Sequence, residues 1–222
     1  SLSGDGGKVE TSGKQKLTVA DTAKVDTTAA KGNTGNWLLD PEDFTIGTGA
    51  TGTNYWNNED LGPALSSSNI TVQTNNASGA GNGDINILAP VSWSANKLTL
   101  SAYRNINIKS TLSATGTAAL DMTSGTGGTG TIDYGLTGSG FTGKVNFGTR
   151  FGNGFLTING NAYTVITSLG NEGSTTGTDL QGMSNNLSGK YFLGSDINAS
   201  STSSWNGNAG FAPIGNETTR FT

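Results

Sequence analysis

The chain contains no cysteine and no histidine among its 222 residues. Without cysteine it has neither a disulfide framework nor a thiolate-ligated metal site. Without histidine it lacks the commonest general base and the commonest zinc ligand. Any chemistry of the chain is therefore left to carboxylates, hydroxyls, amides and aromatic rings.

Charged residues and long apolar runs are also scarce. Only 13% of the residues are charged and the formal net charge is -4, so no basic stripe is present for a phosphate backbone and we expect no nucleic-acid partner. No apolar run approaches the roughly 18 residues that a membrane helix needs, and we expect no membrane insertion. Residues 1–5 lack the basic start and apolar core of a signal peptide. We therefore expect a mature piece of something longer.

Glycine and small polar residues are abundant instead. The chain has 35 glycines, and glycine, serine, threonine and asparagine together make up about half of it, far from average usage. Such a bias favours disorder when charge is high and β-branched or aromatic residues are rare. Here charge is low and short apolar clusters recur along the whole chain, so we expect many short strands separated by turns.

Apolar and polar residues alternate in short bursts, whereas helical periodicity is almost absent. Each burst places apolar side chains on one face and a polar side chain on the other, which is typical of a half-buried strand. Glycine, asparagine and serine separate the bursts, as turn residues do. The bursts lie at residues 17–19, 44–46, 70–72, 85–87, 98–100 and 106–108.

Three of these short strands recur in the same order. The Ile-Asn-Ile at 85–87 returns at 106–108, an offset of about 21 residues, and 91–93 aligns with 112–114 at the same offset. The strand at 98–100 returns one residue later, at 120–122. Because each turn of a solenoid stacks its apolar face on the preceding turn, this repeat predicts an all-β parallel β-helix, or β-solenoid, with three-strand rungs of about 20 residues. The glycine-rich residues 124–130 are expected to form a projecting loop.

Changes in composition along the chain suggest its sections. We expect a β-helical segment over residues 1–169, with an irregular part near 141–166 where aromatic residues are denser. Residues 170–178 are expected to be a link. Residues 179–222 are expected to start a second β-helical repeat section.

Neighbouring carboxylates invite a catalytic interpretation. Glu42 and Asp43 follow Asp40 and Pro41, which suit the first two positions of a type I turn. Adjacent residues of a strand face opposite ways, so Glu42 and Asp43 make a poor acid–base pair. A glycosidase or polysaccharide lyase needs acids that converge from successive turns, and the acids here do not recur at the repeat offset. We therefore expect no enzyme and no catalytic residue, and keep a carbohydrate-active enzyme as the alternative.

Calcium is a second chemical option, because aspartate and asparagine oxygens suit this ion. The glycine–aspartate nonapeptide repeat of calcium-binding β-rolls is absent from the sequence. Asp84, Asp133 and Asp196 each stand alone among polar neighbours, which favours roles in turns. No metal ligand and no cofactor is predicted.

Aromatic residues in polar surroundings are the remaining candidates for binding. Tyr55 and Trp56 lie in Thr-Asn-Tyr-Trp-Asn-Asn, and Trp205 lies in Ser-Ser-Trp-Asn-Gly. Such rings can stack on a sugar, so we predict these three residues as possible glycan contacts; loop anchors and end caps are the alternative. Trp37 and Trp93 lie in strand patterns and are expected to be buried.

Residues 35–46, Gly-Asn-Trp-Leu-Leu-Asp-Pro-Glu-Asp-Phe-Thr-Ile, resemble a segment of the filamentous-haemagglutinin-like exoproteins. These are large adhesins that two-partner secretion systems export in Gram-negative bacteria, and the shared feature is a tryptophan followed by Leu/Ile-Asp-Pro. The similarity continues at residues 7–13 and 25–27, 83–87, 93–102 and 105–108, and in the tail at 163–166, 180–183, 187–191, 196–200 and 210–216.

The resemblance implies a right-handed β-helical fibre, secreted to the bacterial cell surface and used in adhesion, aggregation or biofilm. Its partners would be a host or bacterial surface glycan or protein receptor, and an outer-membrane secretion partner. The family's amino-terminal secretion module carries Asn-Pro-Asn motifs, and no Asn-Pro pair occurs here, so we expect an internal segment. A passive stalk spacer is the further alternative for its role.

Overall fold

The computed structural model describes residues 3–76 and 78–220. The chain divides into two compact units. Unit 1 runs to Val145 and also includes Ile158–Gly160, while unit 2 consists of Asn146–Thr157 and the chain from Asn161 onward. The predicted sections 1–169, 170–178 and 179–222 stay a prediction.

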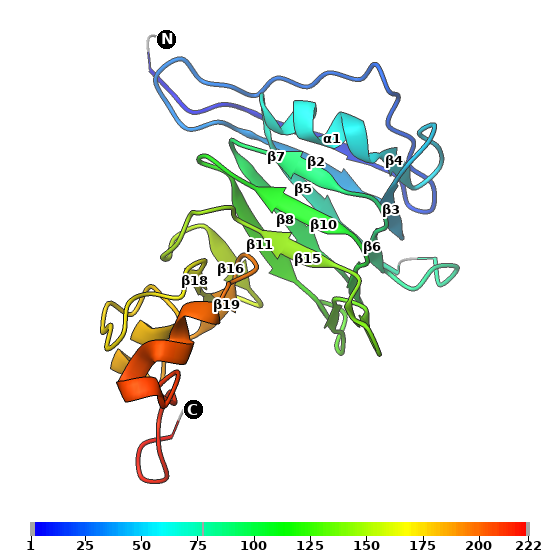
Figure 1. Ribbon diagram of the computed structural model, residues 1–222. Coiled ribbons are helices and arrows are strands. Elements are labelled where there is room, and N and C mark those ends of the chain that lie inside the picture. Colours follow the sequence, from blue (N-terminus) through cyan, green and yellow to red (C-terminus); the bar gives the residue numbers. More distant parts are fainter. Residues whose placement is uncertain (1–2, 77, 221–222) are drawn as a thin grey trace. The chain divides into compact units, whose positions relative to one another are not determined.

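Unit 1 is built from short strands in parallel sheets (Figure 1). Up to β11, the first sheet has the order β1 (Lys8–Ser12), β2 (Asn36–Asp40), β5 (Asn69–Gln73), β8 (Lys97–Ser101) and β11 (Ala119–Thr123). The second has the order β12 (Ile132–Asp133), β9 (Ile106–Ile108), β6 (Ile85–Ile87), β3 (Phe44–Gly47) and β4 (Tyr55–Asn57). The third has the order β15 (Lys144–Asn146), β10 (Thr111–Ala114) and β7 (Val91–Trp93).

The core of unit 1 follows from the alternation of apolar and polar residues. Every second residue of a strand points to the same face, and the apolar set of each strand is buried. Like residues pair across strands: Ile85 lies opposite Ile106 and Leu98 opposite Leu120, which confirms the predicted register of these repeats. The buried set includes Trp37, Leu39, Phe44, Ile46, Ile70, Val72, Ile85, Ile87, Leu98, Leu100, Ile106, Ile108, Leu120 and Met122. Trp93 is also buried, so the expectation for Trp37 and Trp93 is confirmed.

A short helix, α1 (Asn58–Leu65), interrupts the strands. The side chain of Asn57 accepts a hydrogen bond from the backbone N–H of Glu59 and caps the helix. Leu61 and Leu65, four residues apart on one face, are buried. The helix packs against β7, and Gly62 permits this approach because a Cβ there would lie 2.4 Å from the Ser92 carbonyl oxygen. The helix thereby covers an edge strand that would otherwise be open.

The segment between β1 and β2 is anchored by Asn54, which precedes β4. Asn54 has a left-handed φ of 53°. Its side chain accepts from the Leu17 N–H at 2.7 Å and donates to the Gln15 carbonyl at 2.8 Å. Leu17 and Val19 are buried as a result. A stretch without regular secondary structure therefore still contributes to the core of unit 1.

Unit 2 contains more irregular backbone. Its elements are β16 (Leu156–Ile158, of which Ile158 belongs to unit 1), β17 (Asn161–Ala162), β18 (Thr164–Ile166), β19 (Tyr191–Leu193) and the 3-10 helices η1 (Gln181–Asn185) and η2 (Ser200–Asn208). Strand β18 pairs in parallel with β19. The ring of Phe147 makes edge-to-face contacts with Phe155 and Phe192, and these aromatic rings form the centre of the unit.

The predicted right-handed parallel β-helix with three-strand rungs is wrong. The described strands fall into several sheets, parallel and antiparallel pairs are mixed, helices interrupt the strands, and residues 3–76 and 78–220 form no closed solenoid. One antiparallel pair is a hairpin of β13 (Leu136–Thr137) and β14 (Gly140–Phe141).

The physical reason is that the repeat offset holds only locally. Asp84 and Asn105, which precede β6 and β9, are 21 residues apart. The preceding step, from Asp43 to Asp84, takes 41 residues, and the following step, from Asn105 to Thr131, takes 26. Helix α1 lies within the longer connection. Uneven connections of this kind break the regular coil that a fixed period requires.

Candidate functional site

The acidic turn before β3 holds a loop in place. Glu42 is buried and accepts hydrogen bonds from the Ser78 hydroxyl at 2.6 Å and from the Ala80 N–H at 3.1 Å. The Ser78 hydroxyl and neighbouring backbone N–H groups lower the pKa of Glu42. Asp43 accepts from the N–H groups of Asn82 and Asp84 at 3.2 and 2.8 Å. Both carboxylates therefore bind the backbone of the loop that leads into β6.

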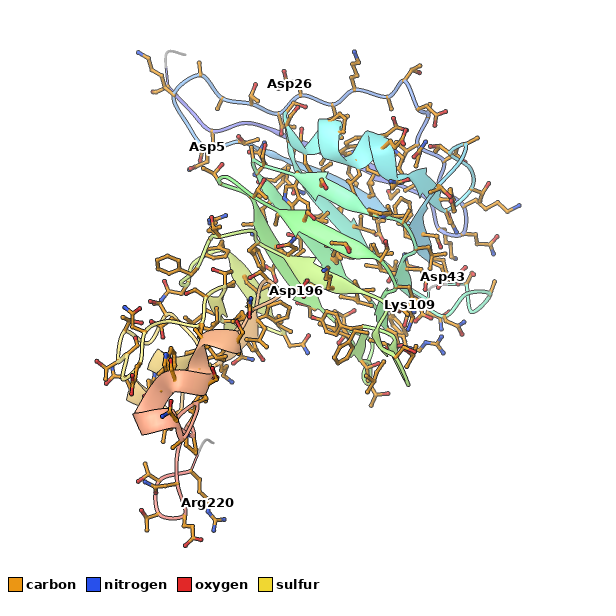
Figure 2. The ribbon with its side chains drawn as sticks, in the orientation of Figure 1. Asp5, Asp26, Asp43, Lys109, Asp196 and Arg220 are labelled. Atoms are coloured by element: carbon orange, nitrogen blue, oxygen red, sulfur yellow. The ribbon has the colours of Figure 1, made fainter. Side chains whose placement is uncertain are left out.

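The same arrangement is repeated along the second sheet. Asp84 accepts the Asn105 N–H at 3.0 Å, and the Asn105 side chain accepts the Thr131 N–H at 3.0 Å. Together with Asp43, labelled in Figure 2, these side chains form an acceptor ladder (Asp43, Asp84 and Asn105) in which each member holds the start of the next strand. Carboxylate and amide oxygens that accept backbone N–H groups stabilise loop ends in this way.

Asp84 carries the strongest electrostatic interaction of the ladder. Its two oxygens accept from Arg104 Nε at 2.8 Å and from Arg104 Nη2 at 2.6 Å, a bidentate pair. Hydrogen bonding to this guanidinium lowers the pKa of Asp84, and the carboxylate in turn raises the pKa of Arg104. Asp84 is only 9% exposed. The ion pair therefore compensates the charge of a nearly buried carboxylate directly before β6.

A further pair of neighbouring carboxylates lies on α1. Glu59 and Asp60 occupy the first helical turn, where negative charge is favourable. Burial, followed by the charges of Asp21 and Glu59, raises the pKa of Asp60. Within residues 3–76 and 78–220, no three histidine, cysteine, aspartate or glutamate side chains are grouped so as to hold a metal ion.

The predicted aromatic contacts Tyr55 and Trp56 lie in β4 rather than in a loop. Trp56 is 1% exposed and its ring meets Trp37 edge-on at 5.4 Å. Its ring is therefore almost entirely covered by protein. Tyr55 is half-buried, its ring lies over Gly47, and its hydroxyl donates to the Thr48 carbonyl at 2.6 Å.

The third predicted contact, Trp205, belongs to unit 2. Its ring is 9% exposed and stacks on Phe211 with a centroid separation of 6.2 Å. The backbone from Trp205 to Gly207 departs from helical geometry within η2. All three predicted aromatic residues thus pack against the protein, and a glycan contact by any of them stays a prediction.

Outward residues of the first sheet form a row of one leucine and three polar side chains. Leu38, Thr71, Thr99 and Asp121 lie side by side on β2, β5, β8 and β11. They alternate with the buried residues of the same strands, and each is half-buried. Neighbouring strands lie about 4.8 Å apart, so this outer row (Leu38, Thr71, Thr99, Asp121) presents side chains at a regular spacing.

A similar set lies on the second sheet. Thr45, Asn86 and Asn107 are in register on β3, β6 and β9, and Asn107 donates to the Asn86 side chain at 2.8 Å. Lys109, labelled in Figure 2, forms an ion pair with Asp133 just beyond this set. The hydrogen bond from Lys109 lowers the pKa of Asp133. The first and second sheets of unit 1 therefore show ordered polar groups on their outward side.

Unit 2 contains a pocket of about 420 Å³. Its lining residues are Tyr163, Leu180, Met183, Gly189, Lys190, Tyr191 and Leu193. Within β19, Tyr191 and Leu193 line the pocket, whereas Phe192 contacts Phe147. This division follows from the alternation of side chains along a strand.

Asp179 positions one wall of this pocket. It is 8% exposed, and its oxygens accept from the Ser174 and Thr176 hydroxyls at 2.6 and 2.7 Å and from the Gly182 N–H at 2.6 Å. These bonds fix the start of η1, from which Leu180 and Met183 reach the pocket. The pocket is thus built on a hydrogen-bonded turn.

The tyrosines of the pocket are held by local contacts. The Tyr191 hydroxyl donates to the Asn186 carbonyl at 2.8 Å, and burial raises the pKa of Tyr191. A Cβ on Gly189 would approach the Tyr191 ring to 2.6 Å. The glycine therefore leaves room for the ring in this position.

Sequence reasoning missed Tyr163, Lys190 and Tyr191 as possible binding residues. They come from separated segments that the pairing of β18 with β19 brings together. The only sequence signal was the density of aromatic residues near 141–166, which includes Tyr163. No spacing in the sequence indicates that Lys190 lies beside it.

The comparisons with known proteins are negative. No protein-family model, no curated protein and no solved structure matches this chain. None of the described helices is long and apolar enough to cross a membrane. The resemblance to filamentous-haemagglutinin-like exoproteins therefore depends only on the sequence segments that carry it.

Proposed function

We propose that the chain is an adhesive segment of a secreted bacterial surface protein, which attaches to a glycan or protein receptor through the outer row of unit 1. The family resemblance and the ordered polar groups on the outward side of the sheets support this proposal. Receptor contact needs accessible side chains held in a fixed geometry, because ordering mobile groups on binding lowers affinity.

The observation that carries the proposal is the register of the outer row. Thr71 lies directly opposite Thr99, and Thr99 lies opposite Asp121. The strands that hold these residues are fixed from the other side by buried Ile70, Leu98 and Leu120. Hydroxyl and carboxylate groups on such a rigid sheet are pre-organised to bond a polar partner.

Catalysis is the rival function. The carboxylates that lie near one another among the described residues support it less well than the outer row supports adhesion. Glu42, Asp43 and Asp84 accept backbone or side-chain hydrogen bonds that stabilise their ionised form. A glycosidase needs one carboxylic acid with a raised pKa and a second carboxylate across the substrate. Asp60 has a raised pKa, but its negative neighbours Asp21 and Glu59 lie with it around α1 rather than across a groove.

An array of glycans and surface proteins tests the proposal. We expect the chain to bind a subset of the array, and the double variant Thr71→Lys with Thr99→Lys to lose at least tenfold in signal. Long charged side chains on the outer row would block contact without entering the core, since both positions face outward. Thr175→Lys, at an exposed loop position of unit 2, is the matched control and should bind like the wild type.

Two other outcomes would contradict the proposal. Silence of the wild type across the array and on whole cells would favour the passive spacer. Release of oligosaccharides from a polysaccharide by the wild type would favour the carbohydrate-active enzyme.

A further inference from the structure

The pocket of unit 2 combines an apolar lining with a single cation. Leu180, Met183 and Leu193 supply aliphatic surface, and Leu193 is 58% exposed at the pocket. Lys190 is the one charged residue of the lining. These three aliphatic side chains line the same pocket, so they are grouped rather than scattered singly over the surface.

The Lys190 ammonium is open to an external anion. It makes no ion pair with any residue in 3–76 or 78–220. The nearest acid in sequence to the lining, Asp179, directs its oxygens to Ser174, Thr176 and the Gly182 N–H. No acidic side chain of the lining therefore competes for the lysine.

Volume and polarity limit the remainder of the ligand. A volume of about 420 Å³ lies near the lower end of the range of about 300–1,000 Å³ found for small-molecule pockets. Apart from Lys190, the polar side-chain groups of the lining are the hydroxyls of Tyr163 and Tyr191, and the Tyr191 hydroxyl already donates to the Asn186 carbonyl. A sugar would lose water from several hydroxyls without replacement in such a site, which is unfavourable.

We propose that this pocket binds a small monocarboxylic acid with an apolar body, its carboxylate at Lys190 and its hydrocarbon against Leu180, Met183 and Leu193. The tyrosine rings of Tyr163 and Tyr191 add flat apolar surface to the same pocket. This binding site is separate from the outer row of unit 1 and does not depend on the adhesive function.

Isothermal titration or ligand-observed NMR with octanoate tests the proposal on the whole chain. Octanoate has the carboxylate and an apolar body of suitable size, octanol has nearly the same body without the charge, and glucuronate has the charge on a polar body. We expect octanoate to bind with a dissociation constant on the order of 0.1–1 mM, given the affinity that small ligands reach per atom. Octanol should bind more weakly, and glucuronate should show no saturable binding.

Two variants test the charged part and the apolar part of the pocket separately. Lys190→Gln should weaken octanoate binding about threefold to fivefold, the upper part of the range for an exposed ion pair, and leave octanol unchanged. Leu193→Ser should weaken both ligands. Lys8→Gln, at an exposed lysine of β1 in unit 1, is the matched control and should change neither. Circular dichroism of each variant verifies that it has folded.

Three results would overturn the proposal. The first is the absence of saturable octanoate binding by the folded wild type up to about 10 mM, well above the affinity expected for such a ligand. The second is unchanged octanoate binding in Lys190→Gln. The third is a preference for glucuronate, or for peptides with a free terminal carboxylate, over the free apolar acid.

Discussion

Replacing Asp84 by asparagine tests the electrostatics of the acceptor ladder. The substitution keeps the size of the side chain but removes its charge, and it turns one of the two oxygens that face Arg104 into an amide donor. Arg104 is 44% exposed at its side chain, so its ion pair contributes about 0.5–1 kcal/mol after screening by solvent. The weaker hydrogen bond from the Asn105 N–H to a neutral acceptor adds about 1 kcal/mol. The variant should therefore lose about 1.5–2 kcal/mol of unfolding free energy at pH 7.

The pH dependence of this loss gives a sharper test. Arg104 lowers the pKa of Asp84 in the folded chain, whereas an unfolded aspartate titrates near pH 3.9. The folded state therefore gains stability from the ionised carboxylate above about pH 4, and it loses this stability as the pH falls through the lower folded pKa. The difference between wild type and Asp84→Asn should be largest between about pH 5 and 7 and should shrink toward pH 3.

Urea unfolding followed by tryptophan fluorescence measures this difference, because Trp37, Trp56 and Trp93 all lie in unit 1. Asp121→Asn, on the outward side of β11, is the control and should change stability by less than about 0.5 kcal/mol. A loss in Asp84→Asn that is equally large at pH 7 and pH 3 would refute the electrostatic explanation. A loss no larger than that of the control would refute the ladder itself.

Three further substitutions, one of them with a matched control, test packing in unit 1. Ile106→Ala removes a fully buried side chain and should lower the unfolding free energy by about 2–5 kcal/mol in urea titrations; a loss below about 1 kcal/mol would contradict the core assignment. Gly143→Ala should raise urea sensitivity strongly, because a Cβ there would lie 1.9 Å from the Ile108 carbonyl oxygen, whereas Gly138→Ala, with no atom within 4 Å, should have little effect; equal effects would contradict the close approach. Trp56→Ala should cost about 3–5 kcal/mol, and a thermally stable variant with unchanged melting temperature would contradict the burial of this ring.

Local alternation in the sequence was enough to find the strands and part of their register. Residues 85–87 and 106–108 pair as the repeat predicts, because apolar side chains on one face must meet the same core. The repeat could not predict closure into a solenoid, which depends on every connection having a compatible length. The pattern of a single strand carries no information on the length of the next connection, such as the 41 residues from Asp43 to Asp84.

Helix α1 was missed because its sequence does not have a helical pattern of sufficient length. Only Leu61 and Leu65 are buried on its inner face, and Gly62 and Pro63 disfavour a helix interior. Tertiary packing against β7 overrides these propensities. The Asn57 cap and the acids at positions 59 and 60 were the signals present in the sequence.

Trp56 shows why the residues that surround an aromatic ring in the sequence do not predict its exposure. Polar residues surround it in sequence, which favours an exposed loop, yet its ring packs on Trp37, nineteen positions earlier by chain and adjacent in the fold. The pocket at Lys190 is a case in which no sequence pattern indicated a site. Its walls come from Tyr163 just before β18, from the start of η1 and from β19 with the residues before it, and their meeting depends on strand pairing that no short motif indicates.

Attachment to cells is the most direct measurement of the proposed function. Beads coated with the whole chain would be counted on epithelial cells and on bacteria after washing, beside beads that carry Thr71→Lys with Thr99→Lys or the control Thr175→Lys. The adhesive function through the outer row predicts retention of wild-type and control beads and loss of most double-variant beads. Equal retention of all three, or none of any, would contradict it.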